Sequence, residues 1–363
     1  MKVATIMGTR PEMIRLSQII PKLDAWAQKH ILVHTGQNID PGLRDVFYEQ
    51  LGIRQPDYFL EQTGCSLANQ IGNIFGLVET MIHRETPDAV LVLGDTTSAL
   101  STLLCARLGV TVYHMEAGNR CYDPSVPEEL NRRVIDAVSS FNLPYTRTSK
   151  ENLLREGISP QRIWECGNPI FEVLQRYRPE IDTSESLDQL QVQPGQYLLV
   201  TAHRAENVDN ESRLRNIVTA LKAVAEHTRL PIICSVHPRT RDRLAHFQID
   251  GGHPLIRYCP PFGLPDFVSL EQHAACVITD SGTVQEECCI LGVPTVTIRT
   301  STERPETVAC GSNIVSGLVS QRIVEGILLM LQSNRQWTVP EGYTDRHVSD
   351  KIVQFILGGL CHV

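Results

Sequence analysis

The 363-residue sequence lacks several features that would define its class at once. No apolar stretch approaches the roughly 18 residues of a membrane-spanning helix, and the first residues carry no signal-peptide pattern. No block of lysine and arginine occurs, and the formal net charge of −8 argues against a nucleic-acid-binding surface. We therefore expect a cytoplasmic protein with no nucleic-acid or membrane partner.

Cysteine is present, but without the spacing of a metal site or a disulfide framework. The eleven cysteines are odd in number, and none forms Cys-x-x-Cys. Most lie inside apolar runs, as Cys105, Cys234 and Cys276 do. We interpret them as reduced thiols of the core. No motif calls for a metal, and we expect no cofactor.

Apolar segments alternate with amphipathic segments along both halves, which is typical of a parallel sheet with crossover helices. The chain is long enough for two units that each bury a core. We predict an α/β protein with two doubly wound, Rossmann-like domains, 1–178 and 196–343, joined by a polar linker, 179–195. A final amphipathic helix within 344–363 could pack on either domain. The expected strands are Val3–Met7, Ile31–Thr35, Ala89–Leu93, Val110–Met115, Tyr197–Thr201, Ile232–Val236, Leu255–Tyr258, Cys276–Thr279 and Pro294–Ile298. The helices expected in the first half are Pro11–Ala27, Leu67–Arg84, Thr97–Leu108 and Pro127–Val138.

Four polar motifs stand where an apolar run stops and an amphipathic run begins. They are Gly8–Glu12, Gly94–Thr97, His114–Gly118 and Asp280–Glu287. Turns from strands into helices gather at the carboxyl edge of a parallel sheet, where ligands bind. Helix N-termini at that edge present N–H groups and a positive dipole end to anions. The motifs predict one cleft whose occupant carries phosphate.

Three carboxylates of the first half are candidates for acid–base chemistry, and two have an ordinary alternative. Asp95 would suit a helix N-cap. Glu128 would gain about 0.3–1 kcal/mol from the dipole of the helix that it begins. Glu116 lies too close to the end of a buried strand to be a routine solvated carboxylate, and carboxylates in clefts are where pKa values shift. We favour the functional interpretation because all three face the same sheet edge.

The second half offers groups that suit a nucleotide. His203 and Arg204 follow one predicted strand, and His237 follows the next. Ser281–Thr283 begins a helix whose N–H groups and hydroxyls could cradle a diphosphate. Glu287, a turn further along, could accept hydrogen bonds from ribose, although first-turn acidity is the ordinary alternative. The nucleotide site is therefore expected in the second domain and the acid–base carboxylates in the first.

Together these motifs resemble those of the non-hydrolysing UDP-N-acetylglucosamine 2-epimerases over nearly the whole chain. The resemblance implies a GT-B fold of two Rossmann-like domains, an active site in a cleft that closes between them, and a homodimer. It further implies anti elimination of UDP to a 2-acetamidoglycal, followed by re-addition of UDP with a proton delivered to the other face of C2. The motifs that carry it are Gly8–Glu12, Gly94-Asp95, His114–Gly118, Pro127–Glu129 with Asn131-Arg132, His203-Arg204, Asp280–Glu287 and Thr302–Glu306.

The resemblance also implies roles for individual residues. Asp95, Glu116 and Glu128 match the acid–base carboxylates, and His203 completes the expected catalytic set near the diphosphate. Phe267 stands where an aromatic residue of the family lies near the uracil. The full set of expected substrate-binding residues is Arg10, Arg15, Arg204, His237, Phe267, Ser281, Gly282, Thr283, Glu287 and Arg304.

The chain departs from the family pattern at several positions. Arg15 replaces the usual lysine, so a charge-pairing role survives whereas a lysine's proton chemistry does not. Thr283 replaces the second glycine of Ser-Gly-Gly. The Gln-His-Arg motif, through which many bacterial members bind an allosteric nucleotide sugar, reads Gln37–Asp40, so the resemblance does not extend that site to this chain.

The loop Asn119–Asp123 looks closer to the branch that acts on substituted UDP-sugars in surface-polysaccharide pathways, such as 2,3-diacetamido uronates or 6-deoxy-amino sugars. In that case Arg15 could pair with a sugar carboxylate. Three alternatives of other kinds stay open from the sequence: a hydrolysing epimerase, a GT-B glycosyltransferase and a catalytically inactive sugar-nucleotide sensor.

Overall fold

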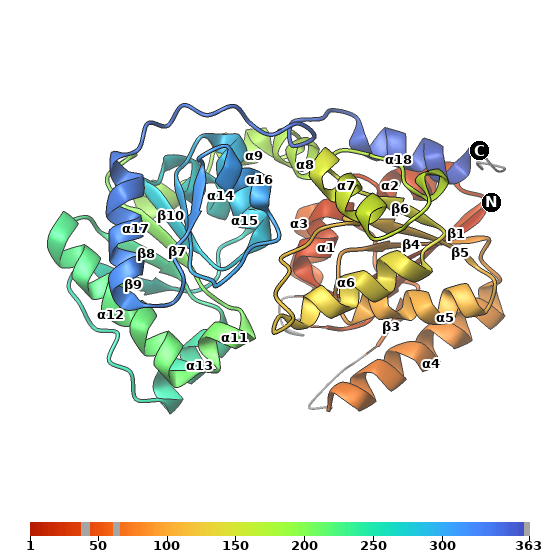
Figure 1. The fold of residues 1–363 in the computed structure, drawn as a ribbon, viewed down its shortest axis with the longest axis horizontal. Coiled ribbons are helices and arrows are strands. Elements are labelled where there is room, and N and C mark those ends of the chain that lie inside the picture. The colour runs from red at the N-terminus through yellow and green to blue at the C-terminus, as the bar shows by residue number, and fades with distance from the viewer. Residues whose placement is uncertain (38–43, 61–65, 359–363) are drawn as a thin grey trace. The chain divides into compact units, whose positions relative to one another are not determined.

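The computed structural model describes residues 1–37, 44–60 and 66–358 (Figure 1). Residues 38–40, which belong to the segment that replaces Gln-His-Arg, lie outside the described residues. The chain divides into two compact units. The first unit comprises Met1–Val173 and Glu341–Val363, and the second comprises Leu174–Pro340.

The first unit contains a six-stranded parallel sheet in the order β3-β2-β1-β4-β5-β6. The order reverses between β1 and β4, which is the topological switch point of a Rossmann-type sheet. The strands are β1 (Lys2–Met7), β2 (Lys29–His34), β3 (Tyr58–Phe59), β4 (Ala89–Leu93), β5 (Thr111–Met115) and β6 (Phe141–Leu143). The helices are α1 (Arg10–Leu16), α2 (Ile20–Trp26), α3 (Arg44–Leu51), α4 (Leu67–Glu85), α5 (Thr102–Arg107), α6 (Pro127–Val138), α7 (Arg147–Arg155), α8 (Ile170–Arg176) and α18 (Val348–Leu357), with 3-10 turns η1 (Ser98–Ser101) and η2 (Pro160–Arg162).

Helices cover both faces of this sheet (Figure 1). Ile6, Val33 and Val92 lie on the face that packs against α4 and α5. Tyr113 lies on the other face, where its ring meets Phe355 of α18 edge to face, with the ring centroids 5.7 Å apart. The sequence left open which domain the final helix joins, and in the structure this helix, α18, packs on the first.

The second unit repeats this topology. Its parallel sheet has the order β12-β11-β10-β7-β8-β9, so its switch point lies between β7 and β10. The strands are β7 (Leu198–Thr201), β8 (Ile232–Ser235), β9 (Ile256–Cys259), β10 (Cys276–Thr279), β11 (Thr295–Thr297) and β12 (Asn313–Val315). The helices are α9 (Arg178–Asp182), α10 (Ser186–Gln189), α11 (Ala205–Val208), α12 (Glu211–Thr228), α13 (Pro238–His246), α14 (Leu264–His273), α15 (Gly282–Leu291), α16 (Pro305–Ala309) and α17 (Ser320–Gln332).

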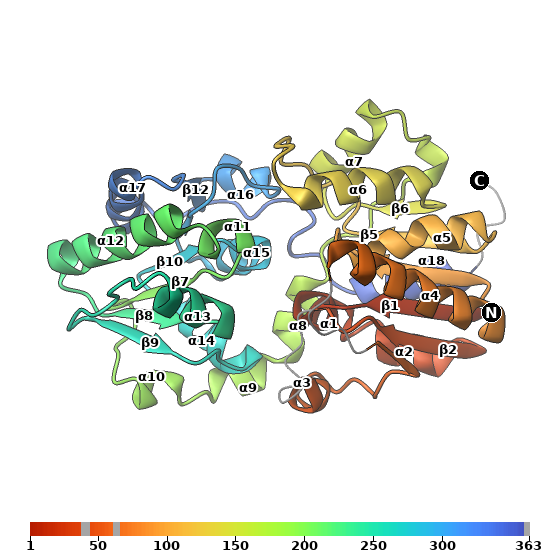
Figure 2. The ribbon, with the colours of Figure 1, turned by 90° about the horizontal axis from the view of Figure 1, so that it is seen from below.

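Alternation along β7 shows how this second core is divided. Leu198 and Val200 belong to the core under α12 and α17, whereas Leu199 belongs to the core formed with α14 and α15. Figure 2 shows α12 and α17 together on one side of the sheet and α14 on the other. Both faces are buried, which explains why the strands read as continuous apolar runs. The expected α/β class with two doubly wound, Rossmann-like domains is confirmed.

The element boundaries differ from expectation in two places. Pro21 at the start of α2 lacks an N–H group, so the single helix expected over Pro11–Ala27 is divided into α1 and α2. The segment expected as a linker, 179–195, contains most of α9 and all of α10, and Val192 within it is buried in the core of the second unit. Short polar helices with few apolar positions give little periodicity, and their packing is decided by the sheet beneath them.

The three cysteines named as examples of core thiols lie in the core, whereas Cys121, Cys259 and Cys310 are only partly buried. Cys105, Cys234 and Cys276 are buried free thiols, and burial raises the pKa of Cys105 to about 12. Within the described ranges, no helix is long and apolar enough to cross a membrane. The same residues hold no cluster of three or more His, Cys, Asp or Glu side chains suited to a metal ion.

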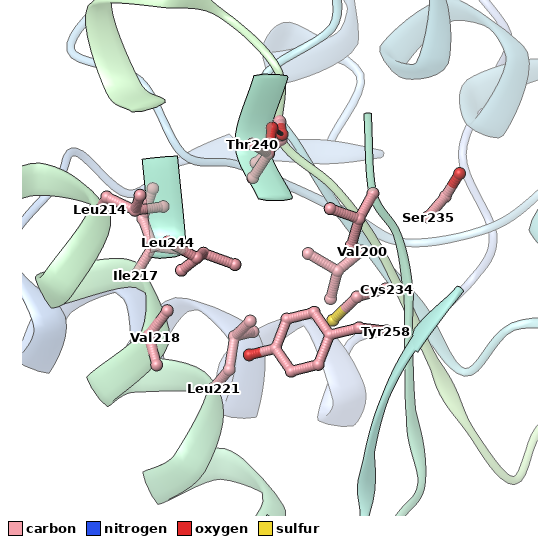
Figure 3. A pocket seen from close by; sticks show the side chains of 12 residues that line it. Val200, Leu214, Ile217, Val218, Leu221, Cys234, Ser235, Thr240, Leu244 and Tyr258 are labelled. Carbon is pink, nitrogen blue, oxygen red and sulfur yellow. Dashed lines mark hydrogen bonds between the residues drawn. The ribbon is translucent and has the colours of Figure 1, made fainter. Parts of the chain in front are cut away.

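A small apolar cavity of about 30 Å³ lies between the second sheet and helices α12 and α13 (Figure 3). The ring of Tyr258 points into it with the hydroxyl toward Leu221. That hydroxyl is shielded from solvent and makes no hydrogen bond with a described residue. Tyr197, in the same unit, is the opposite case, because its buried hydroxyl donates to the Leu270 carbonyl oxygen at 2.5 Å.

We expect Tyr258→Phe to leave the free energy of unfolding unchanged or to raise it by up to about 1 kcal/mol, because it removes a buried polar group without a partner. Tyr197→Phe, its matched control, should lower that free energy by about 1–2 kcal/mol, because it leaves a carbonyl unsatisfied. Urea denaturation of the full chain measures both. Equal losses in the two variants would contradict the geometry around Tyr258.

Candidate active site

The turn after β1 is built around Glu12, which begins the first half of the candidate site. Its carboxylate accepts hydrogen bonds from the N–H of Gly8 at 2.9 Å, the N–H of Thr9 at 2.6 Å and the hydroxyl of Thr96 at 2.9 Å. Burial raises the pKa of Glu12 to about 7. Glu12 thus ties the turns after β1 and β4 together at the switch point. The positively charged residue of this motif is Arg10, which is half-exposed at the first position of α1.

Asp95 follows β4 and is held by α6. Nη2 of Arg132 lies 2.5 Å from an Asp95 carboxylate oxygen, and Asn131 donates to the Asp95 carbonyl at 2.9 Å. The residue that caps the following η1 is Thr97, so the N-cap alternative for Asp95 is not what the structure forms. The buried guanidinium of Arg132 thus holds the Asp95 carboxylate in place. Arg132 was not among the expected site residues, because nothing in its local sequence shows which carboxylate it reaches.

Glu116 has the least ordinary backbone in this half. It follows β5 with φ of +66°, in the left-handed region, which costs a non-glycine residue about 1–3 kcal/mol. Its buried carboxylate forms an ion pair with Arg15 of α1. Arg15 is itself only 2% exposed, and its guanidinium lies 5.8 Å from the centre of the Tyr145 ring. Arg15, expected to bind substrate, therefore lies against the carboxylate of Glu116.

The two glutamates that begin α6, Glu128 and Glu129, have different surroundings. Glu129 is 3% exposed and pairs with Arg132 at 3.0 Å and Arg133 at 3.1 Å, so it holds the helix in place. Glu128, the expected catalytic residue, is partly exposed. The structure thus places Asp95 and Glu116 just after the neighbouring strands β4 and β5, and Glu128 at the start of the helix that holds Asp95.

The second half of the candidate site is organised by Asp280, at the end of β10. Its buried carboxylate accepts from the main-chain N–H of His203 at 3.1 Å, the N–H of Arg204 at 3.0 Å and the side-chain amide of Asn207 at 3.0 Å. Asp280 therefore shapes the loop after the neighbouring strand β7, across the switch point. Sequence reasoning placed Asp280 in a motif without assigning it this task.

Two residues of the β7 loop have different surroundings. The side chain of His203 remains 43% exposed, so its ring is accessible to a ligand. Arg204 donates to the Asp280 carbonyl at 2.9 Å and pairs with Glu303 at 3.2 Å, with its side chain 18% exposed. Arg204 thus links the β7 loop to the segment before α16. If Arg204 also binds substrate, as expected, it has both a structural and a binding role.

Helix α15 begins with the residues expected at the diphosphate. Ser281 is its N-cap residue, and a Cβ added to Gly282 would lie 2.6 Å from a carboxylate oxygen of Glu303, so a larger residue there would displace the Glu303 carboxylate. Glu287, further along, is 3% exposed. Arg304 is buried and forms an ion pair with Glu286 of α15. The helix terminus and Arg304 are therefore held as one rigid group.

Three expected binding residues lie nearer the periphery of this unit. His237 is exposed and caps α13, since its Nδ1 accepts the N–H of Arg239 at 3.3 Å. Phe267 is half-buried on α14 and packs against the core under α14 and α15. Thr283 is half-exposed in the first turn of α15.

Two Rossmann-like domains, each with polar groups gathered at its switch point, place this chain in the GT-B-like class of α/β proteins. The UDP-N-acetylglucosamine 2-epimerase family model matches residues 22–357. The chain belongs to that family. It is 38% identical to the UDP-N-acetylglucosamine 2-epimerase of Methanocaldococcus jannaschii, over 94% of this chain and 95% of the relative.

Further comparisons agree. The Methanocaldococcus jannaschii enzyme solved in complex with UDP-GlcNAc and UDP has a TM-score of 0.93 to this chain, with 37% identity, 99% of this chain covered and 100% of that one. The structure of the Rickettsia bellii UDP-N-acetylglucosamine 2-epimerase gives a TM-score of 0.89, with 38% identity over 99% of this chain and 96% of that one. The UDP-2,3-diacetamido-2,3-dideoxy-D-glucuronate 2-epimerase of Pseudomonas aeruginosa is 36% identical, over 90% of this chain and 91% of the relative.

Proposed function

We propose that this chain interconverts the C2 epimers of UDP-N-acetylglucosamine or of a related UDP-2-acetamido sugar without net hydrolysis. The observation that carries the proposal is the placement of Asp95 and Glu116 after β4 and β5, with Glu128 at the start of α6, in a chain of this family. The first domain supplies the carboxylates and the second binds UDP.

The reaction proceeds by elimination and re-addition. A carboxylate removes the C2 proton while the bond between C1 and the UDP oxygen breaks, giving a 2-acetamidoglycal and UDP. UDP then adds back to C1, and a different side chain, acting as an acid, delivers a proton to the opposite face of C2. Glu116 is held by its ion pair with Arg15, and Asp95 by its ion pair with Arg132. We assign the proton donor to Glu128, which is partly exposed at the start of α6.

Acid–base catalysis by the first domain can supply only part of the rate enhancement. Positioned acid–base catalysis contributes about 100- to 10,000-fold, whereas enzymes supply about 8–23 kcal/mol in all. Stabilisation of the charge that develops on departing UDP provides the remainder. We assign this to Arg10, His203, Arg304 and the N-terminus of α15, with Glu287 accepting from the ribose.

The proposal distinguishes two candidate substrates, UDP-N-acetylglucosamine and a UDP-2,3-diacetamido uronate. Identity to the diacetamido-glucuronate epimerase, 36%, is close to the 38% shared with the UDP-N-acetylglucosamine epimerase, so identity does not separate the two substrates. Arg15, which could have paired with a sugar carboxylate, pairs with Glu116 instead. This favours the uncharged sugar. We include in the proposal a homodimer, a cytoplasmic location and a place in surface-polysaccharide or amino-sugar biosynthesis.

Incubation with UDP-N-acetylglucosamine in D2O tests the proposal. Deuterium should replace the C2 proton in both epimers, and proton NMR should show no steady accumulation of free sugar. Accumulation of UDP and free sugar would indicate a hydrolysing epimerase instead. If the C2 proton exchanged only in the UDP-diacetamido uronate, that substituted sugar would be the substrate. A wild-type enzyme that exchanges the C2 proton of neither sugar would overturn the proposed chemistry.

A further inference from the structure

Helix α14 of the second unit carries a glutamate inside the core. Glu271 is 0% exposed, and both of its carboxyl oxygens are shielded from solvent. Leu270 on α14 and Ala274, which caps the end of that helix, belong to the core that also contains Cys288. Within the described part of the chain, no lysine, arginine or histidine forms an ion pair with Glu271. A buried carboxyl without a cation is costly and needs another explanation.

The polar group beside Glu271 is the carboxyl of Glu287 on the adjacent helix α15, which is also buried. Two carboxylates in such a place repel each other, so one of them must hold a proton. Burial, and then the charge of Glu287, raise the pKa of Glu271 well above its usual value. Glu271 is the more deeply buried of the two, at 0% exposed against 3% for Glu287, and it has no cationic partner among the described residues, so we place the proton on Glu271. Its O–H can then donate a hydrogen bond to the Glu287 carboxylate.

We propose that Glu271 is a positioning residue that donates a hydrogen bond to Glu287 and fixes that carboxylate in the orientation that accepts hydrogen bonds from the ribose. The inference rests on the proposed function, which assigns the ribose to Glu287. A glutamate side chain has several rotatable bonds, and holding it in place before the ligand arrives reduces the entropy lost on binding. A carboxylate offers about four acceptor positions, so one hydrogen bond from Glu271 leaves others for ribose.

A buried, protonated Glu271 should lower the free energy of unfolding at neutral pH. An ordinary packing residue in the core would raise it. In the unfolded chain Glu271 has its usual pKa and releases its proton at neutral pH, whereas in the folded chain it keeps that proton. Its contribution to the free energy of unfolding therefore falls as the pH rises from the usual value toward the raised pKa. The titratable groups that face it are Glu287 and Cys288 on α15 and Tyr197 before β7.

Two variants of the full chain test the inference. Glu271→Leu removes the donor and fills the core, and Glu271→Gln keeps an N–H donor that does not titrate. The readout is the ratio of the dissociation constants of 2′,3′-dideoxy-UDP and UDP, measured by calorimetry at pH 8. This ratio isolates the contribution of the ribose hydroxyls from changes that affect both ligands equally.

We expect Glu271→Leu to lower this ratio at least fivefold while its thermal midpoint at pH 8 stays equal to or above that of the wild type. Glu271→Gln should keep the ratio within threefold of the wild-type value. An unchanged ratio in Glu271→Leu, together with a lowered ratio in Glu287→Gln, would overturn the role of Glu271 alone. A wild-type enzyme that does not distinguish the two ligands would overturn the assignment of ribose to Glu287 and this inference with it, while C2 exchange in D2O would still report on the proposed reaction.

Discussion

Asp95→Asn, Glu116→Gln and Glu128→Gln should each lower C2 epimerisation by about 100- to 10,000-fold, the range that positioned acid–base groups contribute. Each amide keeps the shape of the side chain but can neither take up nor release the proton at C2. Loss of the C2 proton signal in D2O measures the rate directly. The three rates should fall whichever residue is the acid and whichever is the base, because re-addition reverses the roles used in elimination.

UDP affinity is the internal control for these variants. The residues assigned to UDP lie mostly on the second unit, whereas the three carboxylates lie on the first, so the dissociation constant of UDP should change only a few-fold. Glu116→Gln also leaves Arg15 buried without its charged partner, which costs about 3–5 kcal/mol, so its thermal midpoint must be measured as well. Glu151→Gln, a change at a surface glutamate of α7, should leave the rate unchanged. Near-normal turnover by the triple variant would remove the acid–base assignment.

His203→Ala should lower both UDP affinity and the rate of epimerisation. A hydrogen bond to a charged diphosphate contributes about 1.5–3 kcal/mol, which corresponds to roughly 10- to 100-fold in the dissociation constant. The rate should fall further than affinity, because charge on the UDP oxygen increases as its bond to C1 breaks. Since the side chain of His203 is 43% exposed, its removal leaves no buried gap, and the fold should be unaffected.

Calorimetry with UDP and single-turnover kinetics measure the two effects separately. His227→Ala, at an exposed position near the end of α12, is the matched control and should change neither. If UDP affinity were unchanged in both His203→Ala and Arg10→Ala, the diphosphate would have to bind elsewhere. If only affinity fell, His203 would be a binding residue that does not stabilise the leaving group.

The candidate site shows where sequence reasoning reaches its limit. Glycine, proline and short polar residues mark the end of a strand locally, so the sequence alone places the motifs at Gly8, Gly94 and Ser281 at strand ends. The partner of a charged side chain is not local. Arg132 is visible in its motif, but that it holds Asp95 rather than a substrate phosphate follows only from the packing of α6 against β5 and η1.

The sequence by itself determined the α/β class, the strands of both sheets that are long and apolar, the motifs at their ends and the family, because each of these depends on residues close together in the chain. The tertiary structure decided the short edge strands β3, β6 and β12, the unit that α18 joins, and the partners of the buried charges. Glu116 with Arg15 and Glu287 with Glu271 are pairs across different elements, and the burial that raises the pKa of Glu271 exists only in the folded chain.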